Sequence, residues 1–127
     1  SPYYRGTDCN FWALYDDNSH LAGATIHLLS DGLDSGAILY HAMSEKNSDP
    51  FLYTMSTVKS AFHSLSEKIK NGSIFKMSED LQDKSKEIRY SKKIDFTNQV
   101  VKEFFKKKIN IDKKFDQSLL KDPYFLK

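Results

Sequence analysis

The sequence predicts a mixed α/β fold, and three features of its first 75 residues indicate it. Two segments with the apolar and β-branched content of strands, residues 22–29 and 37–43, flank a glycine-containing loop. Residues 51–70 then repeat apolar side chains at steps of three or four, as an amphipathic helix does. With 39% hydrophobic and 13% aromatic residues, the 127-residue chain has enough apolar surface for the core of one small domain.

The first twenty residues predict a loop, a short helix and a turn. Residues 1–6 are expected to be irregular, because Pro2 lacks an amide hydrogen and Gly6 tolerates unusual backbone angles. A short helix is expected from residue 7 or 8 to residue 15, with Asp8 as its cap. Its apolar contacts would come from Phe11, Trp12 and Leu14. Residues 16–19 are polar and predict a turn.

Two strands are expected next. Residues 22–29 form an almost continuous apolar run, which predicts a strand buried on both faces. Residues 30–36 interrupt this run with Gly32 and Gly36, and residues 37–43 resume as a second strand. We expect the two strands to lie side by side in one sheet.

The helix over residues 51–70 is the most strongly patterned element. Ser48 or Asp49 would cap it, Pro50 suits its first turn, and Asn71-Gly72 would end it. Six apolar residues share one face, which we expect to pack against the core: Phe51, Met55, Val58, Phe62, Leu65 and Ile69.

The second part of the chain is more polar. Residues 74–91 are expected to be irregular, and residues 96–107 to form a helix with Phe96, Val100, Val101 and Phe104 facing inward. After residue 109 the periodicity is too weak to assign an element. We therefore divide the chain into residues 1–75, which carry the main α/β unit, and residues 76–127, a Lys-rich extension that packs on it.

Composition excludes some classes of protein. No apolar run approaches the ~20 residues that cross a bilayer, so no membrane partner is expected. Cys9 is the single cysteine, which fits a reducing compartment, and we expect a cytoplasmic protein without a cysteine-based metal site. The net charge is +2, but the tail is basic around residues 102–108 with Lys113 and Lys114 beyond. This stretch is interpreted as a solvated face, with contact to nucleic-acid phosphates as the alternative.

The loop between the two expected strands holds two carboxylates, Asp31 and Asp34. Ligands of open α/β sheets bind where strands end, so a carboxylate there is a candidate general acid or base. Asp-Gly sequences are also ordinary turns, so the pattern alone leaves both interpretations open.

Three consecutive segments resemble the signatures of the folate-dependent formyltransferases. They are Arg5-Gly6 followed by Trp12, then Gly23-Ala24-Thr25-Ile26-His27, then Asp34-Ser35-Gly36-Ala37-Ile38. Their order and spacing agree together over the first third of the chain. The resemblance implies the C-terminal half of a Rossmann-like domain, with a mixed sheet and flanking helices. It also implies transfer of a formyl group from N10-formyltetrahydrofolate to a primary amine.

In such an enzyme an amine attacks the formyl carbon, the developing oxyanion needs fixed donors, and a proton must leave nitrogen. The resemblance assigns the proton transfer to Asp34, and the pterin-binding backbone to Asp31, Gly32 and Leu33. It assigns the oxyanion donors to an Asn-x-His motif, which we expect a few residues before Ser1, so the chain by itself is expected to be inactive. Folate is the cosubstrate and no metal is implied.

Three further residues have two interpretations each. His27 would orient Asp34 or pack in the core. Arg5 would contact an anionic substrate group or tie down its loop. Trp12 would pack in the core or stack on a substrate ring. The remaining histidines, His20, His41 and His63, are interpreted as surface or packing residues.

The family acts on three kinds of amine: initiator methionyl-tRNA, glycinamide ribonucleotide and nucleotide-linked amino sugars. Asp8, Asn10 and His27 resemble the amino-sugar type, which is therefore the expected substrate class, with methionyl-tRNA as the alternative. A homodimer is compatible with this assignment. The alternative of another class is a non-catalytic remnant or binding module that retains half of the fold.

Overall fold

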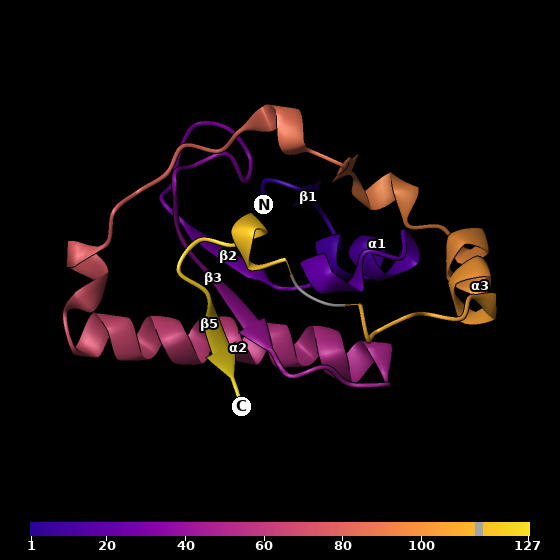
Figure 1. The fold of residues 1–127 in the computed structure, drawn as a ribbon. Coiled ribbons are helices and arrows are strands. Elements are labelled where there is room, and N and C mark those ends of the chain that lie inside the picture. Colours follow the sequence, from indigo (N-terminus) through magenta and orange to yellow (C-terminus); the bar gives the residue numbers. More distant parts are fainter. Residues whose placement is uncertain (114–115) are drawn as a thin grey trace.

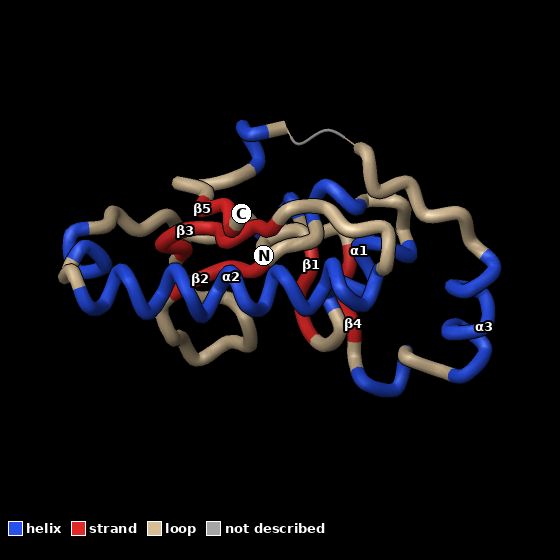
Figure 2. The backbone as a smooth tube through the Cα atoms, turned by 90° about the horizontal axis from the view of Figure 1, so that it is seen from below, coloured by secondary structure: helices blue, strands red, loops and turns tan. Residues whose placement is uncertain are grey.

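The structure is a computed structural model that describes residues 1–113 and 116–127. It confirms a mixed α/β fold: two small sheets lie beside one long helix, α2 (Pro50–Lys70), which runs along one side of the molecule (Figures 1 and 2). Lys114, part of the basic stretch noted in the sequence, lies outside the described residues. Among the described residues, no helix combines the length and the apolar character needed to cross a membrane.

The strands form a parallel pair and a mixed three-stranded sheet. The pair consists of β1 (Tyr4–Gly6) and β4 (Arg89–Ser91). The second sheet has the order β2 (Ala24–His27), β3 (Ile38–Ser44), β5 (Tyr124–Leu126). Strand β3 pairs antiparallel with β2 and parallel with β5. This confirms the expectation that the two strands flanking the glycine loop lie side by side in one sheet.

Two expectations about strands were wrong. Residues 1–6 are not all irregular, because residues 4–6 form β1 against a strand that lies more than 80 positions away in the sequence. The first strand of the second sheet covers residues 24–27 instead of 22–29, and its side chains are only half-buried. Strand β2 is at the edge of the sheet, whereas β3 is central and all seven of its residues are buried. The apolar run continues into the loop, where Leu29 is 98% exposed.

Helices α1 (Cys9–Tyr15) and α3 (Asn98–Lys106) pack together around aromatic side chains. Phe11 of α1 contacts Phe104 of α3, with ring centroids 4.7 Å apart. Thr97 caps α3 by accepting the backbone N–H of Val100. Asp8 precedes α1 as expected, but it adopts a left-handed conformation with φ of 55° and its side chain makes no capping hydrogen bond.

Both ends of α2 (Pro50–Lys70) are where the sequence predicts them. The side chain of Asp49 accepts the backbone N–H of Leu52 at 3.0 Å, and Pro50 occupies the first turn. Gly72 follows the helix with φ of 74°, a conformation that glycine adopts without steric cost.

The face of α2 that packs on the protein is not the predicted one. The apolar stripe is largely exposed, with Phe51 at 68% and Phe62 at 71% exposure. The buried face instead consists of Tyr53, Thr57, Ser60 and Ser64.

Hydrogen bonds satisfy the hydroxyls of this buried face. Ser60 donates to the carbonyl of Met43 at 2.6 Å, and Ser64 pairs with the hydroxyl of Tyr40 at 3.0 Å. Small side chains let a helix lie close to a sheet, and hydroxyls with partners are buried at little cost. Periodicity alone does not distinguish such a face from an apolar one.

Residues 76–127 contribute a strand to each sheet, which the sequence did not predict. Strand β4 lies within the stretch expected to be irregular, and β5 within the stretch to which no element was assigned. Short helical turns cover Ser73–Lys76, Lys84–Lys86 and Lys93–Asp95.

Candidate functional site

Asp34 lies in the connection between β2 and β3, residues 28–37, which we call the Asp34 loop. Its backbone is left-handed, with φ of 52°. Its carboxylate Oδ2 accepts the backbone N–H of Gly6 at 3.1 Å. The end of β1 and the Asp34 loop, 28 residues apart in the sequence, therefore meet at this carboxylate.

Arg5 reinforces the same junction. Its Nη2 donates to the carbonyl of Leu33 at 2.5 Å, and its Nη1 forms an ion pair with Glu87 at 2.9 Å. The side chain is 14% exposed, and its guanidinium lies over the ring of Tyr90. Of the two interpretations of Arg5, the contacts match the one in which it ties down the loop.

Gln82 also holds the loop, and sequence analysis missed it. Its Nε2 donates to the carbonyls of Asp34 and Gly36, both at 2.8 Å. Gln82 lies in the polar stretch between α2 and β4, which carries no periodic signal. A glutamine there gives no sequence sign that it contacts a loop 46 residues earlier.

Gly6 and Gly36, two glycines of the segments that resemble the formyltransferases, are required by packing. Gly6 has φ of 95°, and a β-carbon there would overlap the carbonyl of Ser91 in β4. A β-carbon at Gly36 would overlap the carbonyl of Leu28 across the loop. Both glycines thus permit the close backbone approaches that fix Asp34 in place.

An open hollow of about 470 Å³ lies beside the Asp34 loop. It is lined by His27 and residues 29–34. Asp31, Gly32 and Leu33 are exposed at its tip, and the backbone N–H groups of residues 31–34 donate to no protein group in the described structure. Exposed backbone donors beside a hollow of this size are available to a polar ligand.

His27 borders this hollow but does not orient Asp34. Its Nδ1 lies 2.7 Å from the carbonyl of Leu28, so Nδ1 carries the proton and donates to that carbonyl. No hydrogen bond joins His27 to Asp34 in the described structure. The histidine stabilises the start of the loop.

Trp12 belongs to the core. It is 3% exposed, its ring contacts Phe11 and Tyr15, and the guanidinium of Arg89 lies 4.3 Å from its centroid. Arg89 in turn donates two hydrogen bonds to the carboxylate of Asp16, at 2.9 and 2.6 Å. The Arg89 guanidinium, which is only partly exposed, thus occupies the face of the ring on which a substrate would stack.

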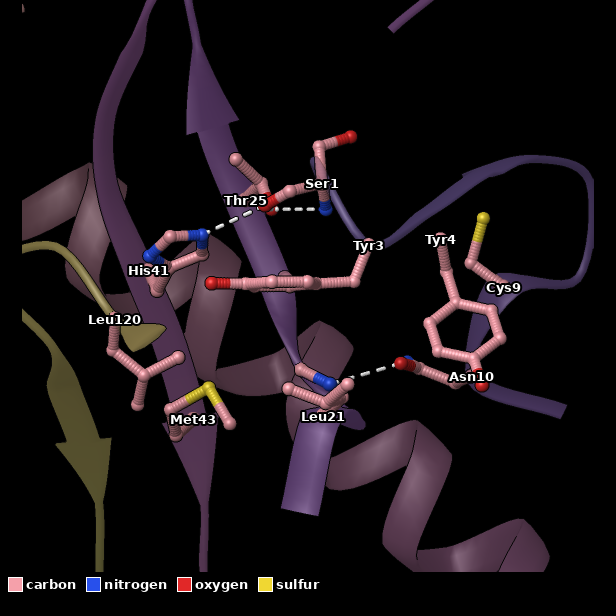
Figure 3. Close-up of a pocket in the computed structure, with 12 residues that line it drawn as sticks. Ser1, Tyr3, Tyr4, Cys9, Asn10, Leu21, Thr25, His41, Met43 and Leu120 are labelled. Carbon is pink, nitrogen blue, oxygen red and sulfur yellow. Dashed lines mark hydrogen bonds between the residues drawn. The ribbon is translucent and has the colours of Figure 1, made fainter. Parts of the chain in front are cut away.

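A small cavity of about 40 Å³ lies between α1 and the β2-β3 sheet (Figure 3). His41 of β3 borders one side of it, and Asn10 of α1 the other. Asn10 accepts the N–H of Gly23 at 2.9 Å and donates to Thr57 at 2.8 Å, so its side chain joins α1 to α2 and to the residue that precedes β2. The cavity is far smaller than the several hundred Å³ of a substrate pocket, and its polar groups serve packing.

The buried His41 is neutral. Its Nδ1 accepts the backbone N–H of Lys121 at 2.9 Å, which leaves the proton on Nε2 for the carbonyl of Ser1 at 2.9 Å. Burial lowers the pKa of His41 below its ordinary value of 6.5. His63 is half-exposed and lies 2.8 Å from the hydroxyl of Tyr124. Both are packing residues, as the sequence suggested.

The sequence also contains an Asn-x-His triplet, Asn18-Ser19-His20, that sequence analysis passed over. It follows the Arg5-Gly6 segment, whereas the family motif precedes it. Asn18 donates to the hydroxyl of Tyr4 at 2.9 Å. His20 lies near Lys113 and Asp17, and burial is the main cause that lowers its pKa. Neither side chain hydrogen-bonds to Asp34, so this triplet does not complete the site.

Within residues 1–113 and 116–127, no three His, Cys, Asp or Glu side chains are grouped to hold a metal ion. Of the residues expected at the site, the structure brings together Arg5, Leu33 and Asp34, with Asp31, Gly32 and His27 around the adjoining hollow. Trp12 lies in the core. Models of protein families and curated proteins were compared with the sequence, and none of them matches it.

Proposed function

We propose that this chain carries the acid/base half of a formyltransferase site. The substrate would be the amine of a nucleotide-linked amino sugar, and the formyl donor N10-formyltetrahydrofolate. The observation that carries the proposal is the hydrogen bond between the Gly6 N–H and the Asp34 carboxylate, which joins two of the resembling segments. Arg5, in the same segment as Gly6, holds the neighbouring carbonyl of Leu33. The Rossmann-like architecture implied by the resemblance belongs to the same proposal.

The role of Asp34 follows from which of its oxygens is occupied. Oδ2 accepts from Gly6, while Oδ1 has no protein donor in the described structure. An oxygen free of partners on a carboxylate fixed by the backbone is suited to accept the proton that the amine loses, directly or through a water. The cosubstrate supplies the formyl carbon, and the exposed backbone of residues 31–33 would hold its pterin.

A second candidate function is ligand binding without catalysis. No histidine or asparagine side chain hydrogen-bonds to Asp34 in the described part of the chain, and groups of one catalytic site act as a unit. A chain with Asp34 alone would bind folate at the Asp34 loop and release it unchanged. The two candidates share the binding site and differ in turnover.

Titration of the ¹⁵N-labelled chain with 5-formyltetrahydrofolate tests the shared site. We expect amide shifts confined to residues 27–36 and to Gly6, and none in α3. Shifts that cluster elsewhere, or none at millimolar ligand, would contradict the proposal. A formyl-transfer assay of the full-length protein with N10-formyltetrahydrofolate and an amino-sugar nucleotide, with methionyl-tRNA as the parallel acceptor, then separates the candidates. Turnover favours the enzyme, and saturable binding without turnover favours the binding module.

A further inference from the structure

We infer that a single buried water molecule joins Arg5 to Gln82 beside the Asp34 loop. The inference concerns the support of the loop and is independent of formyl transfer. It starts from two polar atoms, Nε of Arg5 and Oε1 of Gln82, which are buried and form no hydrogen bond with a protein group in the described structure. Burial of an unpaired polar atom is costly, so folded proteins pair nearly all such atoms with protein groups or with ordered water.

The hydrogen bonds of Gln82 fix the orientation of its side-chain amide. Its Nε2 donates to the carbonyls of Asp34 and Gly36, both at 2.8 Å. The reversed amide would set Oε1 against these two carbonyl oxygens, and oxygen acceptors repel one another. Oε1 is therefore an acceptor that needs a donor from outside the Asp34 loop.

Arg5 contributes the complementary group. Its Nη1 donates to Glu87 and its Nη2 to the carbonyl of Leu33. The Nε–H is left without an acceptor among the described residues, and it does not reach Gln82 directly. A donor on Arg5 and an acceptor on Gln82 thus need the same kind of intermediary.

Arg5 and Gln82 border the same small cavity, whose volume is about 20 Å³. The other residues that line it are Pro2, Ser35 and Lys84. A cavity needs roughly 10–15 Å³ to hold one water molecule, provided that polar partners are within reach. The volume therefore suits a single water and excludes an organic ligand.

The water has three protein partners at this position. It accepts the Nε–H of Arg5 and donates one hydrogen to Oε1 of Gln82. Its second hydrogen is directed to the hydroxyl of Ser35, which pairs with the hydroxyl of Ser30 at 2.8 Å and keeps a lone pair for a further donor. Three hydrogen bonds are the usual number for a buried water.

The lining selects a neutral molecule over an ion. The occupant must accept from Arg5 and donate to Gln82 at the same time, and water does both. Arg5 and Lys84 would attract a chloride ion, but chloride has no hydrogen for Oε1, and Glu87 already pairs with the Arg5 guanidinium at 2.9 Å. A metal cation would face that guanidinium. Water is therefore the ligand that satisfies both orphaned atoms.

This water completes a junction of three segments. Arg5 belongs to β1, Ser35 to the Asp34 loop, and Gln82 to the stretch between α2 and β4. Direct hydrogen bonds tie the loop to Arg5 and to Gln82 separately. The water ties these two supports to each other, so Arg5 and Gln82 hold the loop as one unit.

A high-resolution crystal structure of the chain tests the site directly. We expect one ordered oxygen within about 2.7–3.2 Å of both Arg5 Nε and Gln82 Oε1. A crystal soaked in sodium bromide tests the ion, because bromide replaces chloride and scatters anomalously. An anomalous peak in the cavity would assign the site to an anion and overturn the inference. A map that shows other buried waters but no density between Arg5 and Gln82 would overturn it as well.

Nuclear magnetic resonance tests the same water in solution. The Hε of Arg5 in the ¹⁵N-labelled chain should show a rotating-frame Overhauser cross-peak to water, whose sign separates it from chemical exchange. Gln82→Met removes the acceptor of the water, so the cross-peak should disappear and the exchange of Hε should accelerate about 10-fold. Gln99→Met on the exposed side of α3 is the matched control and should leave both unchanged. Absence of the cross-peak in the parent, or its survival in Gln82→Met, would contradict a water shared by the two residues.

Discussion

The carboxylate of Asp34 and the backbone N–H of Gly6 are hydrogen-bonded at 3.1 Å, although 28 residues separate them in the sequence. Through this contact, the Arg5-Gly6 segment at the end of β1 supports the Asp34 loop. It also leaves one carboxylate oxygen of Asp34 without a protein donor in the described structure.

Replacing Asp34 by asparagine in the full-length protein should abolish proton transfer while preserving the loop. Asparagine tolerates the left-handed backbone, and its amide oxygen still accepts from Gly6. We expect kcat for formyl transfer to fall by about 10² or more, with folate binding nearly unchanged. Asp31→Asn is the control, because Asp31 is exposed and should tolerate the change. If kcat falls in the Asp31 variant and stays normal in the Asp34 variant, the roles of the two loop carboxylates have been misassigned.

Gln82→Ala should loosen the Asp34 loop. It removes both hydrogen bonds to the carbonyls of Asp34 and Gly36, and we expect a loss of ~1–3 kcal/mol in the free energy of unfolding. Amide hydrogen exchange in residues 31–37 should accelerate. Gln99→Ala on the exposed side of α3 is the matched control and should change stability by less than ~0.5 kcal/mol. If the two substitutions change stability equally, Gln82 does not stabilise the Asp34 loop.

Gly6→Ala and Gly72→Ala separate backbone conformation from steric overlap. Both glycines have positive φ, but a β-carbon at Gly72 meets no atom within 4 Å, whereas one at Gly6 overlaps the carbonyl of Ser91. Gly72→Ala should therefore cost ~1 kcal/mol of unfolding free energy. Gly6→Ala should cost several times more and separate β1 from β4. Similar losses in chemical denaturation would show that β1 and β4 pair more loosely than the structure has them.

Stability should decrease in mild acid because of His41. Its pKa in the folded protein is lowered, mainly by burial, so the unfolded chain binds the proton more tightly. The stabilisation is complete above the ordinary value of 6.5 and is lost as the pH falls from there through the folded-state value. Protonation would also end the hydrogen bond in which Nδ1 accepts from Lys121.

Urea unfolding at a series of pH values between 8 and 5 measures this dependence. His41→Gln should reduce the pH dependence of the free energy of unfolding. His63→Gln, at a half-exposed position, should leave that dependence as it is in the parent protein. His20, whose pKa is also lowered, contributes in the same direction. A slope that survives in the His41 variant and disappears in a His20→Gln variant would assign the effect to His20.

The buried face of α2 should reject large side chains. Ser60→Leu places a branched side chain at a fully buried position and removes the hydrogen bond to Met43, so we expect a loss of ~2–4 kcal/mol. Ser66→Leu on the exposed side of the same helix should stay within ~0.5 kcal/mol. The measurement is thermal or urea unfolding at low micromolar concentration. A larger loss at Ser66 than at Ser60 would restore the helix face predicted from the sequence.

The local sequence was sufficient for features that depend on neighbouring residues. Asp49, Pro50 and Gly72 define the ends of α2 because caps and turns act within a few positions. The β2–loop–β3 unit was also predictable, since two apolar segments joined by a short glycine loop pair with each other. The same local pattern marked Asp31 and Asp34 as candidate carboxylates, and the family resemblance then singled out Asp34.

The tertiary structure decided what depends on distant partners. Strand β1 exists because β4 lies beside it, and Gln82 holds the Asp34 loop across 46 residues without any local signal. The face of α2 was decided by the fit of Ser60 and Ser64 against β3 and of Thr57 against Asn10 of α1, where hydroxyls find hydrogen-bond partners and small side chains allow close packing. Apolar residues repeated at helical spacing identify a helix and its apolar face. Only the shape and hydrogen-bonding groups of the opposing surface determine which side of the helix is buried.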